Sequence, residues 1–246
     1  MGYHESLTEG RNAVLEAFRS GKTVDRLFVL DGCQDGPVKT ILREAKKQDT
    51  MVQYVKKERL DQLSETKNHQ GVIAYCAACE YAEVSDILEN AKKKGEAPFI
   101  VLLDGIEDPH NLGAIIRTAN QAGAHGVIIP KRRAVGLTAT VARTSAGAVN
   151  YTPVAKVTNL VTVMEDLKKE GMWFVCADMD GEEMYSLNLK GPIGLVIGNE
   201  GEGVSRLVKE HCDMVASIPM KGDIDSFNAS VAMGVLAYEI VRQRRF

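Results

Sequence analysis

The sequence predicts an α/β protein in which a small α/β domain precedes a larger domain built on a parallel sheet. Short apolar runs alternate with segments of helical periodicity along the whole chain. From Pro98 onward the apolar runs are nearly continuous. Such runs are typical of parallel strands that helices cover on both faces.

Composition limits the classes of protein and partner. The chain has 246 residues and a net charge of −3, so any contact with RNA must rely on local basic patches. No apolar run approaches the ~20 residues of a membrane span, and no signal peptide is recognisable. The pair Cys76 and Cys79 forms the one CxxC, within an expected strand and without two further zinc ligands nearby. We therefore expect a cytoplasmic protein with no metal and no membrane contact.

Residues 1–78 are expected to form the small domain. Periodicity predicts helices at 12–19, 37–48 and 58–65, and strands at 26–30, 51–55 and 71–77. Residues 79–84 are expected to be a linker, and residues 85–246 the second domain. Ser85 is expected to cap the first helix of that domain, and Gly95 to end it.

In the second domain the alternation is stronger. Strands are predicted at 99–104, 126–130, 173–178, 194–200 and 214–220. Helices are predicted at 111–123, 140–149, 157–171, 203–212 and from about Ser226 to the end of the chain. Ligands of parallel sheets bind at the carboxyl ends of the strands, so the loops that follow these strands are the expected location of a site.

The first such loop leads into a helix with an arginine beside its apolar face. Arg117 stands off that face, roughly in line with Gly113 one turn earlier, and the glycine would leave the surface beside Arg117 open. Asn111 stands at the helix start, where its side chain can cap the helix or reach a ligand. A solvated arginine and an ordinary cap would also explain these residues.

The second loop, GNEGEG at 198–203, lets the backbone approach a ligand closely. Its glycine order differs from the dinucleotide fingerprint and no GK[ST] follows, which disfavours an oxidoreductase or a P-loop protein. Glu200 could serve a ligand or cap the next helix. In the third loop, Ser226, Asn228 and Ser230 crowd one helix start where capping needs a single polar residue, which suggests a ligand or a substrate hydroxyl.

Together these stretches resemble the SpoU (TrmH) family of RNA ribose 2′-O-methyltransferases in the SPOUT superfamily. The matching segments are NLGAIIRTA at 111–119, LVIGNEGEG at 195–203, and IPM at 218–220 followed by SFNAS at 226–230. The first domain resembles the family's substrate-binding domain, which is similar to ribosomal protein L30e. EGRNAVLEAF at 9–18 and NHQGVIA at 68–74 resemble the subfamily that modifies a guanosine in large-subunit RNA.

The resemblance implies a fold, a cofactor and an activity. The fold would be a parallel-sheet SPOUT domain with a C-terminal trefoil knot, the methyl donor S-adenosylmethionine (AdoMet), and the assembly a homodimer with the site near the interface. The activity would be 2′-O-methylation of a guanosine ribose in 23S ribosomal RNA. Transfer RNA is the alternative substrate, and an inactive RNA-binding factor for ribosome assembly is the alternative class of protein.

The resemblance also implies roles for individual residues. Catalytic roles fall on Arg117, Asn111, Glu200, Ser226 and Asn228. Cofactor binding falls on Thr144, Ser145, Leu195, Val196, Gly198, Asn199, Gly203, Ile218, Pro219, Met220, Phe227 and Asn228. Family members often carry leucine where this chain has Phe227, and a backbone contact to the donor should tolerate that departure.

A mechanism follows as a hypothesis. Because a guanidinium is almost always protonated, Arg117 is expected to stabilise a developing alkoxide and pair with the adjacent phosphate. Glu200 is expected to orient Arg117 or the donor loop, and Asn111 and Asn228 to hold the ribose and the loop. Candidate RNA contacts are Lys131, Arg132, Arg133 and Arg143 in the second domain, and Arg11, Lys46, Lys47, Lys56 and Lys57 in the first.

Overall fold

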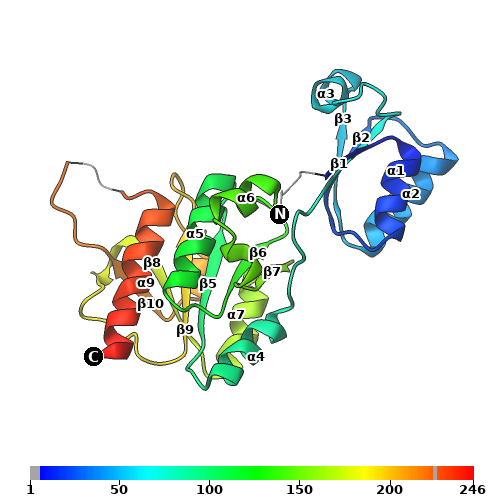
Figure 1. Ribbon diagram of the computed structural model, residues 1–246. Helices are drawn as coiled ribbons and strands as arrows, with labels where there is room; N and C mark the ends of the chain where they lie inside the picture. The colour runs from blue at the N-terminus through cyan, green and yellow to red at the C-terminus, as the bar shows by residue number, and fades with distance from the viewer. Residues whose placement is uncertain (1–5, 224–225) are drawn as a thin grey trace. The chain divides into compact units, whose positions relative to one another are not determined.

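The computed structural model describes residues 6–223 and 226–246, which form two compact units (Figure 1). Unit 1 contains the described residues up to Glu80 together with Gly136–Thr140. Unit 2 contains Tyr81–Val135 and Val141–Phe246. Each unit combines helices with a single sheet, so the predicted α/β class is confirmed.

Unit 1 has a four-stranded sheet in the order β1-β4-β2-β3. Strands β2 and β3 are parallel, whereas β4 runs antiparallel to both β2 and β1. Strand β1 was not predicted, because SLTE is short and polar and lies at a sheet edge. The elements are β1 (Ser6–Glu9), α1 (Arg11–Arg19), β2 (Val24–Leu30), α2 (Gly36–Lys47), β3 (Met51–Val55), α3 (Lys57–Leu63) and β4 (Val72–Cys76).

The alternation of side chains along β2 and β4 gives unit 1 two apolar layers. On one face, Leu27 and Val72 pack with the buried sides of α1 and α2. On the other face, Phe28 and Ile73 pack against Leu60 of α3. Helices α1 and α2 therefore cover one face of the sheet, as Figure 1 shows, and α3 packs on the other.

Unit 2 has a six-stranded sheet in the order β10-β8-β9-β5-β6-β7, and every pairing is parallel, as predicted. Its strands are β5 (Phe99–Asp104), β6 (Gly126–Pro130), β7 (Val154–Val157), β8 (Trp173–Glu183), β9 (Ile193–Gly198) and β10 (Met214–Ser217). Its helices are α4 (Val84–Lys94), α5 (Pro109–Gln121), α7 (Leu160–Lys169), α8 (Arg206–Glu210) and α9 (Ala229–Arg245), while α6 (Ala139–Thr144) enters it from the segment of unit 1, and a 3-10 turn covers Ala148–Asn150.

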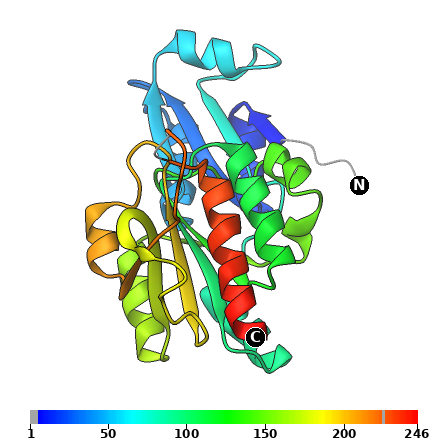
Figure 2. The same cartoon turned by 90° about the vertical axis from the view of Figure 1, so that its left-hand side faces the viewer.

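Helices cover both faces of this sheet. Residues of α4, α7 and α8 pack with β5, β6, β8 and β9 in one apolar cluster. Helices α5 and α9 pack against each other on the other side and lie side by side in Figure 2. Their approach is close, since a Cβ on Gly234 of α9 would lie 3.5 Å from Cγ2 of Thr118 on α5.

Several predicted boundaries were wrong. Helix α4 begins at Val84 with Glu83 at the N-cap, so Ser85 is inside the helix; the Glu83 N–H donates to Asp86 at 2.8 Å. Gly95 does end that helix, in a left-handed conformation. Helix α9 begins at Ala229, three residues after the expected start.

Two other expectations fail because an element ends early or is very short. Strand β4 ends at Cys76, so Cys79 is not on the same strand. Helix α6 is only six residues long, because Gly147 adopts a left-handed conformation before the 3-10 turn. Strand β7 was not predicted, since VAKV is a four-residue strand at the sheet edge.

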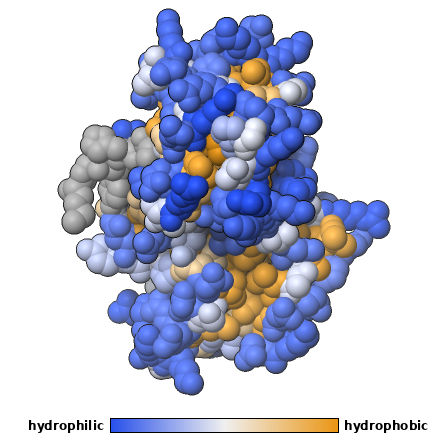
Figure 3. Space-filling view, turned by 90° about the vertical axis from the view of Figure 1, so that its right-hand side faces the viewer, coloured by the Kyte–Doolittle hydropathy of each residue, from blue (hydrophilic) through white to orange (hydrophobic). Residues whose placement is uncertain are grey.

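The described part of the chain contains no helix that is long and apolar enough to cross a membrane. The same residues contain no group of three His, Cys, Asp or Glu side chains that could hold a metal ion. Figure 3 shows a face on which hydrophilic residues predominate and apolar residues gather in a few patches.

Candidate active site

Three loops of unit 2 meet at the carboxyl edge of its sheet. They follow β5, β9 and β10 and lead into α5, α8 and α9. Strands β5 and β9 are neighbours with Asp104 paired to Gly198, so the first two loops leave the sheet side by side. This is the position at which parallel α/β sheets bind their ligands.

One residue from each loop joins a hydrogen-bond network. The Asn111 amide donates to Oε1 of Glu200 at 2.9 Å. The Asn228 amide donates to Oδ1 of Asn111 at 3.0 Å and also to Oε1 of Glu200. These three residues were predicted from separate segments of the sequence, and the structure brings them together.

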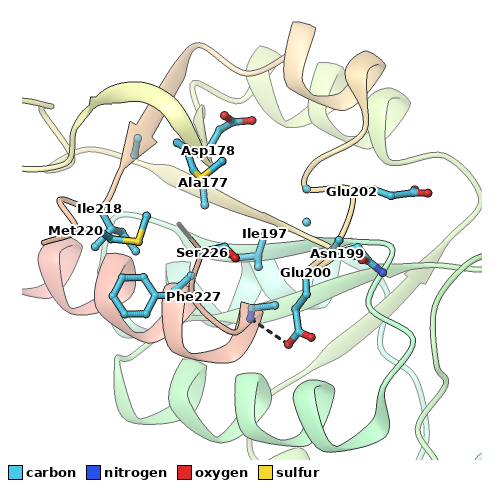
Figure 4. Close-up of a pocket in the computed structure, with 17 residues that line it drawn as sticks. Ala177, Asp178, Ile197, Asn199, Glu200, Glu202, Ile218, Met220, Ser226 and Phe227 are labelled. Carbon is cyan, nitrogen blue, oxygen red and sulfur yellow. Dashed lines mark hydrogen bonds between the residues drawn. The ribbon is translucent and has the colours of Figure 1, made fainter. Parts of the chain in front are cut away.

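Glu200 binds the start of α9 rather than capping α8. Its Oε1 accepts a hydrogen bond from the Ala229 N–H at 3.4 Å, the dashed line in Figure 4. At the start of α8, the Ser205 N–H instead donates to Asp104 at 2.8 Å. Capping of the next helix, one of the two interpretations of Glu200, is therefore wrong.

Asn228 is the N-cap of α9 as well as a member of the network. Its Oδ1 accepts from the N–H of Ser230 at 3.0 Å and of Val231 at 3.4 Å, and from the Ser230 hydroxyl at 2.5 Å. An asparagine cap contributes on the order of 1 kcal/mol. The capping function therefore accounts for Asn228 and Ser230, and leaves Ser226 free of it.

The glycine loop is compact because backbone meets backbone. A Cβ on Gly198 would lie 2.0 Å from the carbonyl carbon of Gly203, which no side chain could tolerate. The N–H groups of Asn199 and Gly203 bond each other's carbonyl oxygens at 3.1 and 2.8 Å. The Asn199 side chain donates to the Gly105 carbonyl at 3.0 Å and accepts from the Gly201 N–H at 2.7 Å. The loop after β9 is thereby fastened to the loop after β5.

A cavity of about 260 Å³ lies between these loops and the end of β8 (Figure 4). Its apolar wall is formed by Ile197, Ala216, Ile218, Met220 and Phe227. The glycine loop from Gly198 to Gly203 and Ser226 supply its polar part. A cavity with an apolar wall and an exposed glycine backbone suits a ligand with a flat ring at one end and polar groups at the other.

Part of the cavity wall was missed by the sequence analysis. Ala177 and Asp178 lie at the end of the predicted strand and Met179 just beyond it, in a β8 that continues to Glu183, and all three line the cavity. They line the cavity because β8 lies beside β9 in the sheet, and the strand order was not predicted from the sequence.

Asp178 is held at this wall by Lys209 of α8, whose Nζ lies 2.7 Å from its Oδ2. Burial by itself would raise the pKa of Asp178, but the hydrogen bonds from Lys209 and the Asp180 N–H outweigh it and lower that pKa. The ion pair ties β8, which lines the cavity, to α8.

Arg117 lies on α5, between the network and the end of that helix. Its side chain is exposed and has no hydrogen bond or ion pair within residues 6–223 and 226–246. Glu200 does not contact it, so the structure favours the alternative in which Glu200 orients the donor loop. The unengaged guanidinium on α5 remains available to an anionic ligand.

The expected reason for Gly113 is wrong. Gly113 is buried, and a Cβ there would lie 1.8 Å from Oγ1 of Thr144 and 3.0 Å from the Ser145 nitrogen. The glycine is required because the end of α6 packs directly onto α5. It does not leave an open surface beside Arg117.

Some expected cofactor residues do not line the cavity. Leu195 and Val196 are fully buried within β9, Ser145 is buried, and Thr144 packs on α5. Pro219 lies between Ile218 and Met220 but is not part of the lining. Gly198, Asn199, Gly203, Ile218, Met220, Ser226 and Phe227 are part of it.

The fold and the cavity define a class: an α/β protein that binds a small ligand at the carboxyl edge of a parallel sheet, on a glycine loop without a dinucleotide or P-loop fingerprint. Comparison with known proteins identifies the family. Residues 98–238 match the model of the SpoU rRNA methylase family. Residues 7–82 match the model for RNA 2′-O ribose methyltransferase substrate binding.

Individual relatives agree with the family models. YacO of Bacillus subtilis, assigned to the TrmH family of tRNA/rRNA methyltransferases, is 48% identical over 96% of this chain and 94% of its own length. The SpoU methyltransferase AviRb of Streptomyces viridochromogenes, solved with AdoMet, is 27% identical with a TM-score of 0.62, over 98% of this chain and 91% of that one. An AdoMet-bound rRNA methyltransferase of Sinorhizobium meliloti is 25% identical with a TM-score of 0.61, over 97% and 87%.

The chain belongs to the SpoU (TrmH) family and is an RNA methyltransferase of that type. The family resemblance seen in the sequence is therefore confirmed, and so is the general activity. Solved SpoU methyltransferases carry AdoMet, the donor expected from the resemblance.

Proposed function

We propose that the protein transfers a methyl group from AdoMet to the 2′-hydroxyl of a guanosine in 23S ribosomal RNA. The observation that carries this proposal is the convergence of Asn111, Glu200 and Asn228 beside a glycine-walled cavity, with Arg117 unengaged on the same helix as Asn111. The cavity offers a site for the methyl donor, and the hydrogen-bond network holds the loops around it in place. Arg117 offers a free cation to a polyanionic substrate.

The cavity residues fit AdoMet. Gly198 and Gly203 bring bare backbone to the cavity floor, where a Cβ on Gly198 would collide with Gly203. The apolar side chains of Ile218, Met220 and Phe227 would hold the adenine, and the backbone of the glycine loop its polar groups. When bound, AdoMet supplies a methyl group made electrophilic by its sulfonium centre.

The residues of this chain then act on the acceptor. A ribose hydroxyl is a poor nucleophile near neutral pH, so the site must favour loss of its proton as the methyl moves. Arg117 is suited to stabilise the negative charge on that oxygen and to pair with the adjacent phosphate. Because the guanidinium is a fixed cation, water or phosphate would carry the proton away.

Glu200, Asn111, Asn228 and Ser226 would act mainly by position. Oε1 of Glu200 accepts hydrogen bonds from the starts of α5 and α9 and so holds both helices against the glycine loop. These bonds fix the position of Asn111 relative to the cavity. Holding donor and acceptor groups in a productive geometry can supply much of a rate enhancement. Ser226 lines the cavity and would contact the donor or the ribose.

The choice of ribosomal over transfer RNA rests on the first domain. Residues 7–82 match a substrate-binding model, and the Sinorhizobium relative that aligns over nearly the whole chain is an rRNA methyltransferase. We keep residues 1–78 as the RNA-binding domain, 79–84 as the linker and 85–246 as the methyltransferase domain. Arg132 and Arg133 are exposed after β6 and would contact RNA there. An activity on ribosomal RNA implies a cytoplasmic protein.

The trefoil knot and the homodimer belong to the same proposal. Helix α9 presents Val231 and Tyr238, which are 47% and 51% exposed, two turns apart on its outward face. A second copy of the chain that covered this face would bury both side chains. Sedimentation of wild type and Tyr238→Glu would detect the dimer and its loss.

The activity is tested by incubating the protein with methyl-labelled AdoMet and either large-subunit rRNA or bulk tRNA. A 2′-O-methyl group blocks alkaline cleavage at its nucleotide, so the label should appear in an alkali-resistant guanosine dinucleotide. Arg117→Ala should reduce transfer by about 100-fold or more while AdoMet binding is retained, in the range for lost transition-state stabilisation. Arg117→Lys should also be strongly impaired, because a lysine cannot make the bidentate contact.

Each other outcome has a definite meaning. Label on tRNA alone would keep the chemistry and overturn the rRNA substrate. AdoMet binding without transfer to either RNA would point to an assembly intermediate as the substrate. Absence of AdoMet binding would favour the inactive RNA-binding factor.

A further inference from the structure

The two sequence segments of unit 1 that resemble the family lie at one end of its strands. Because β4 is antiparallel to both neighbours, the ends of β1 and β2 lie beside the start of β4. The N–H of Leu30 bonds the Gly71 carbonyl at 2.8 Å, and the N–H of Gly10 bonds the Val72 carbonyl at 3.3 Å. The segments 9–18 and 68–74 therefore meet at this end of the strands.

The loop at this end of the strands, residues 64–71, is fastened by Glu9. Oε1 of Glu9 accepts from the N–H of Glu65 at 2.8 Å and of Thr66 at 3.2 Å. Oε2 accepts from the hydroxyl of Thr66 at 3.0 Å and from the hydroxyl of Ser64. One half-buried carboxylate thus receives four donors from a single turn of chain.

The charged form of Glu9 is favoured by these donors. Burial alone would raise the pKa of Glu9, but the hydrogen bonds from Ser64, Glu65 and Thr66 together outweigh burial and lower that pKa. The carboxylate is consequently ionised at neutral pH. A negative charge that no cation neutralises repels the phosphates of RNA. A carboxylate in an RNA-binding domain therefore calls for a structural reason.

Arg11 and His69 fasten the other half of the loop. Nε of Arg11 donates to the Gln70 carbonyl at 3.0 Å, and the Arg11 N–H donates to the Gln70 side chain at 3.1 Å. The guanidinium also pairs with Asp35 at 2.6 Å. The buried His69 accepts from the Gly71 N–H at 3.0 Å, so NHQG forms the turn itself. Arg11 is therefore engaged, and is not one of the free cations that the sequence suggested for RNA.

The tip of the loop points into solvent and has a strained backbone. Lys67 and Gln70 have positive φ values of 59° and 50°, which non-glycine residues seldom adopt unless their surroundings impose it. The side chains of Lys67 and Asn68 are exposed and have no hydrogen bond or ion pair among the described residues. An ordered loop that presents an unpaired lysine and an unpaired amide can bind RNA with little further loss of conformational entropy.

We propose that the loop 64–71 is the RNA-contacting element of unit 1, and that Glu9 and Arg11 are positioning residues that hold it preformed. Lys67 contacts a phosphate and Asn68 a base or ribose of the substrate RNA. The inference rests on the proposed function, since it requires an RNA substrate. It explains why the recognisable segments of this unit lie at one end of its strands.

The first test compares two lysines of unit 1. Lys67→Gln should weaken binding of the full chain to the RNA that it methylates by about tenfold and reduce the slope of log affinity against log salt by about 1, as for one lost phosphate contact. Lys22→Gln is the matched control, because Lys22 is also exposed but lies beyond the far end of α1. Equal affinities for the two variants would overturn the proposal.

The second test asks whether removal of the Glu9 charge weakens or tightens RNA binding. Glu9→Ala removes a negative charge, which by electrostatics alone should tighten RNA binding. We expect instead about tenfold weaker binding and a higher KM for RNA, with kcat and AdoMet affinity unchanged. Glu16→Ala removes the same charge from the exposed side of α1 and should bind as wild type or slightly tighter.

A conservative variant separates positioning from simple loss of folding. Glu9→Gln keeps Oε1 for the two backbone donors and should bind RNA within about threefold of wild type.

A double variant, Glu9→Ala with Lys67→Gln, should bind little worse than either alone, because both act through one loop. Additive losses, or tighter binding by Glu9→Ala, would overturn the proposal. If wild type neither binds nor methylates RNA, the proposed function itself fails.

Discussion

Glu9 in unit 1 and Glu200 in unit 2 each fasten a loop, but in opposite ways. Glu9 lies outside its loop and collects four donors from three consecutive residues, 64–66. Glu200 lies within its loop and reaches out to Asn111, Asn228 and Ala229, which begin two different helices. The first arrangement stiffens one turn, whereas the second sets the relative position of three segments. Failure of the first should be local, and failure of the second should affect the whole site.

The largest expected effect comes from the floor of the unit 2 loop. Gly198→Ala would place a Cβ 2.0 Å from the backbone of Gly203 and should abolish AdoMet binding, with a loss of stability of roughly 1–3 kcal/mol from overpacking. Calorimetric titration with AdoMet and thermal unfolding would measure both.

Gly201→Ala is the matched control in the same loop. A Cβ there would meet only Oδ1 of Asn199 at 3.5 Å, an ordinary contact, so AdoMet binding should stay within about threefold of wild type. Equal losses in the two variants would show that the loop fails by flexibility rather than by the collision at Gly198.

A smaller effect is expected when the Glu200 network is cut. Glu200→Ala removes the acceptor shared by Asn111, Asn228 and Ala229 and should lower kcat by about 100-fold, as misplacement of catalytic groups does. Glu200→Gln keeps Oε1 as an acceptor, so its kcat should stay within about fivefold of wild type. Single-turnover methylation would measure both rates. A Gln variant as impaired as the Ala variant would mean that the charge, and not the network, is required.

The smallest effect is the pH dependence of the Glu9 turn. Because folding lowers the pKa of Glu9, its contribution to stability is fully present above the unfolded value of about 4.5 and is lost as the pH falls through the lower, folded value. The contribution should be below about 1 kcal/mol, since the group is partly exposed. Thermal unfolding of wild type and Glu9→Gln should differ most above pH 4.5 and converge at lower pH. A difference that grew on acidification would contradict the assignment.

The sequence was most informative where burial leaves little choice. Strands β3, β5 and β6 begin and end where their apolar runs predict. Helix starts were less certain, because they depend on caps: Glu83 rather than Ser85 precedes α4, and Asn228 rather than Ser226 begins α9. The edge strands were missed because each has only four residues, and β1 is polar as well.

The candidate site also has features that the sequence could predict and features that depend on the fold. Spacing could place Asn111 and Asn228 at helix starts, but they are 117 residues apart, and nothing in the sequence shows that their side chains touch. Gly113 was noticed, yet its reason lies in Thr144, which packs on it from another helix. Glu9 was not singled out at all, because a single carboxylate near a strand end carries no periodic or motif signal.

The backbone floor of the cavity has a consequence for resistance. A competitor of the methyl donor that bound the Gly198–Gly203 floor would contact atoms that every amino acid possesses, so few side-chain replacements could weaken its hold. Gly198 itself cannot accept a larger residue without a collision with Gly203. Escape from such an inhibitor would have to arise at the apolar wall, at Ile218, Met220 or Phe227, where the natural donor would be disturbed as well.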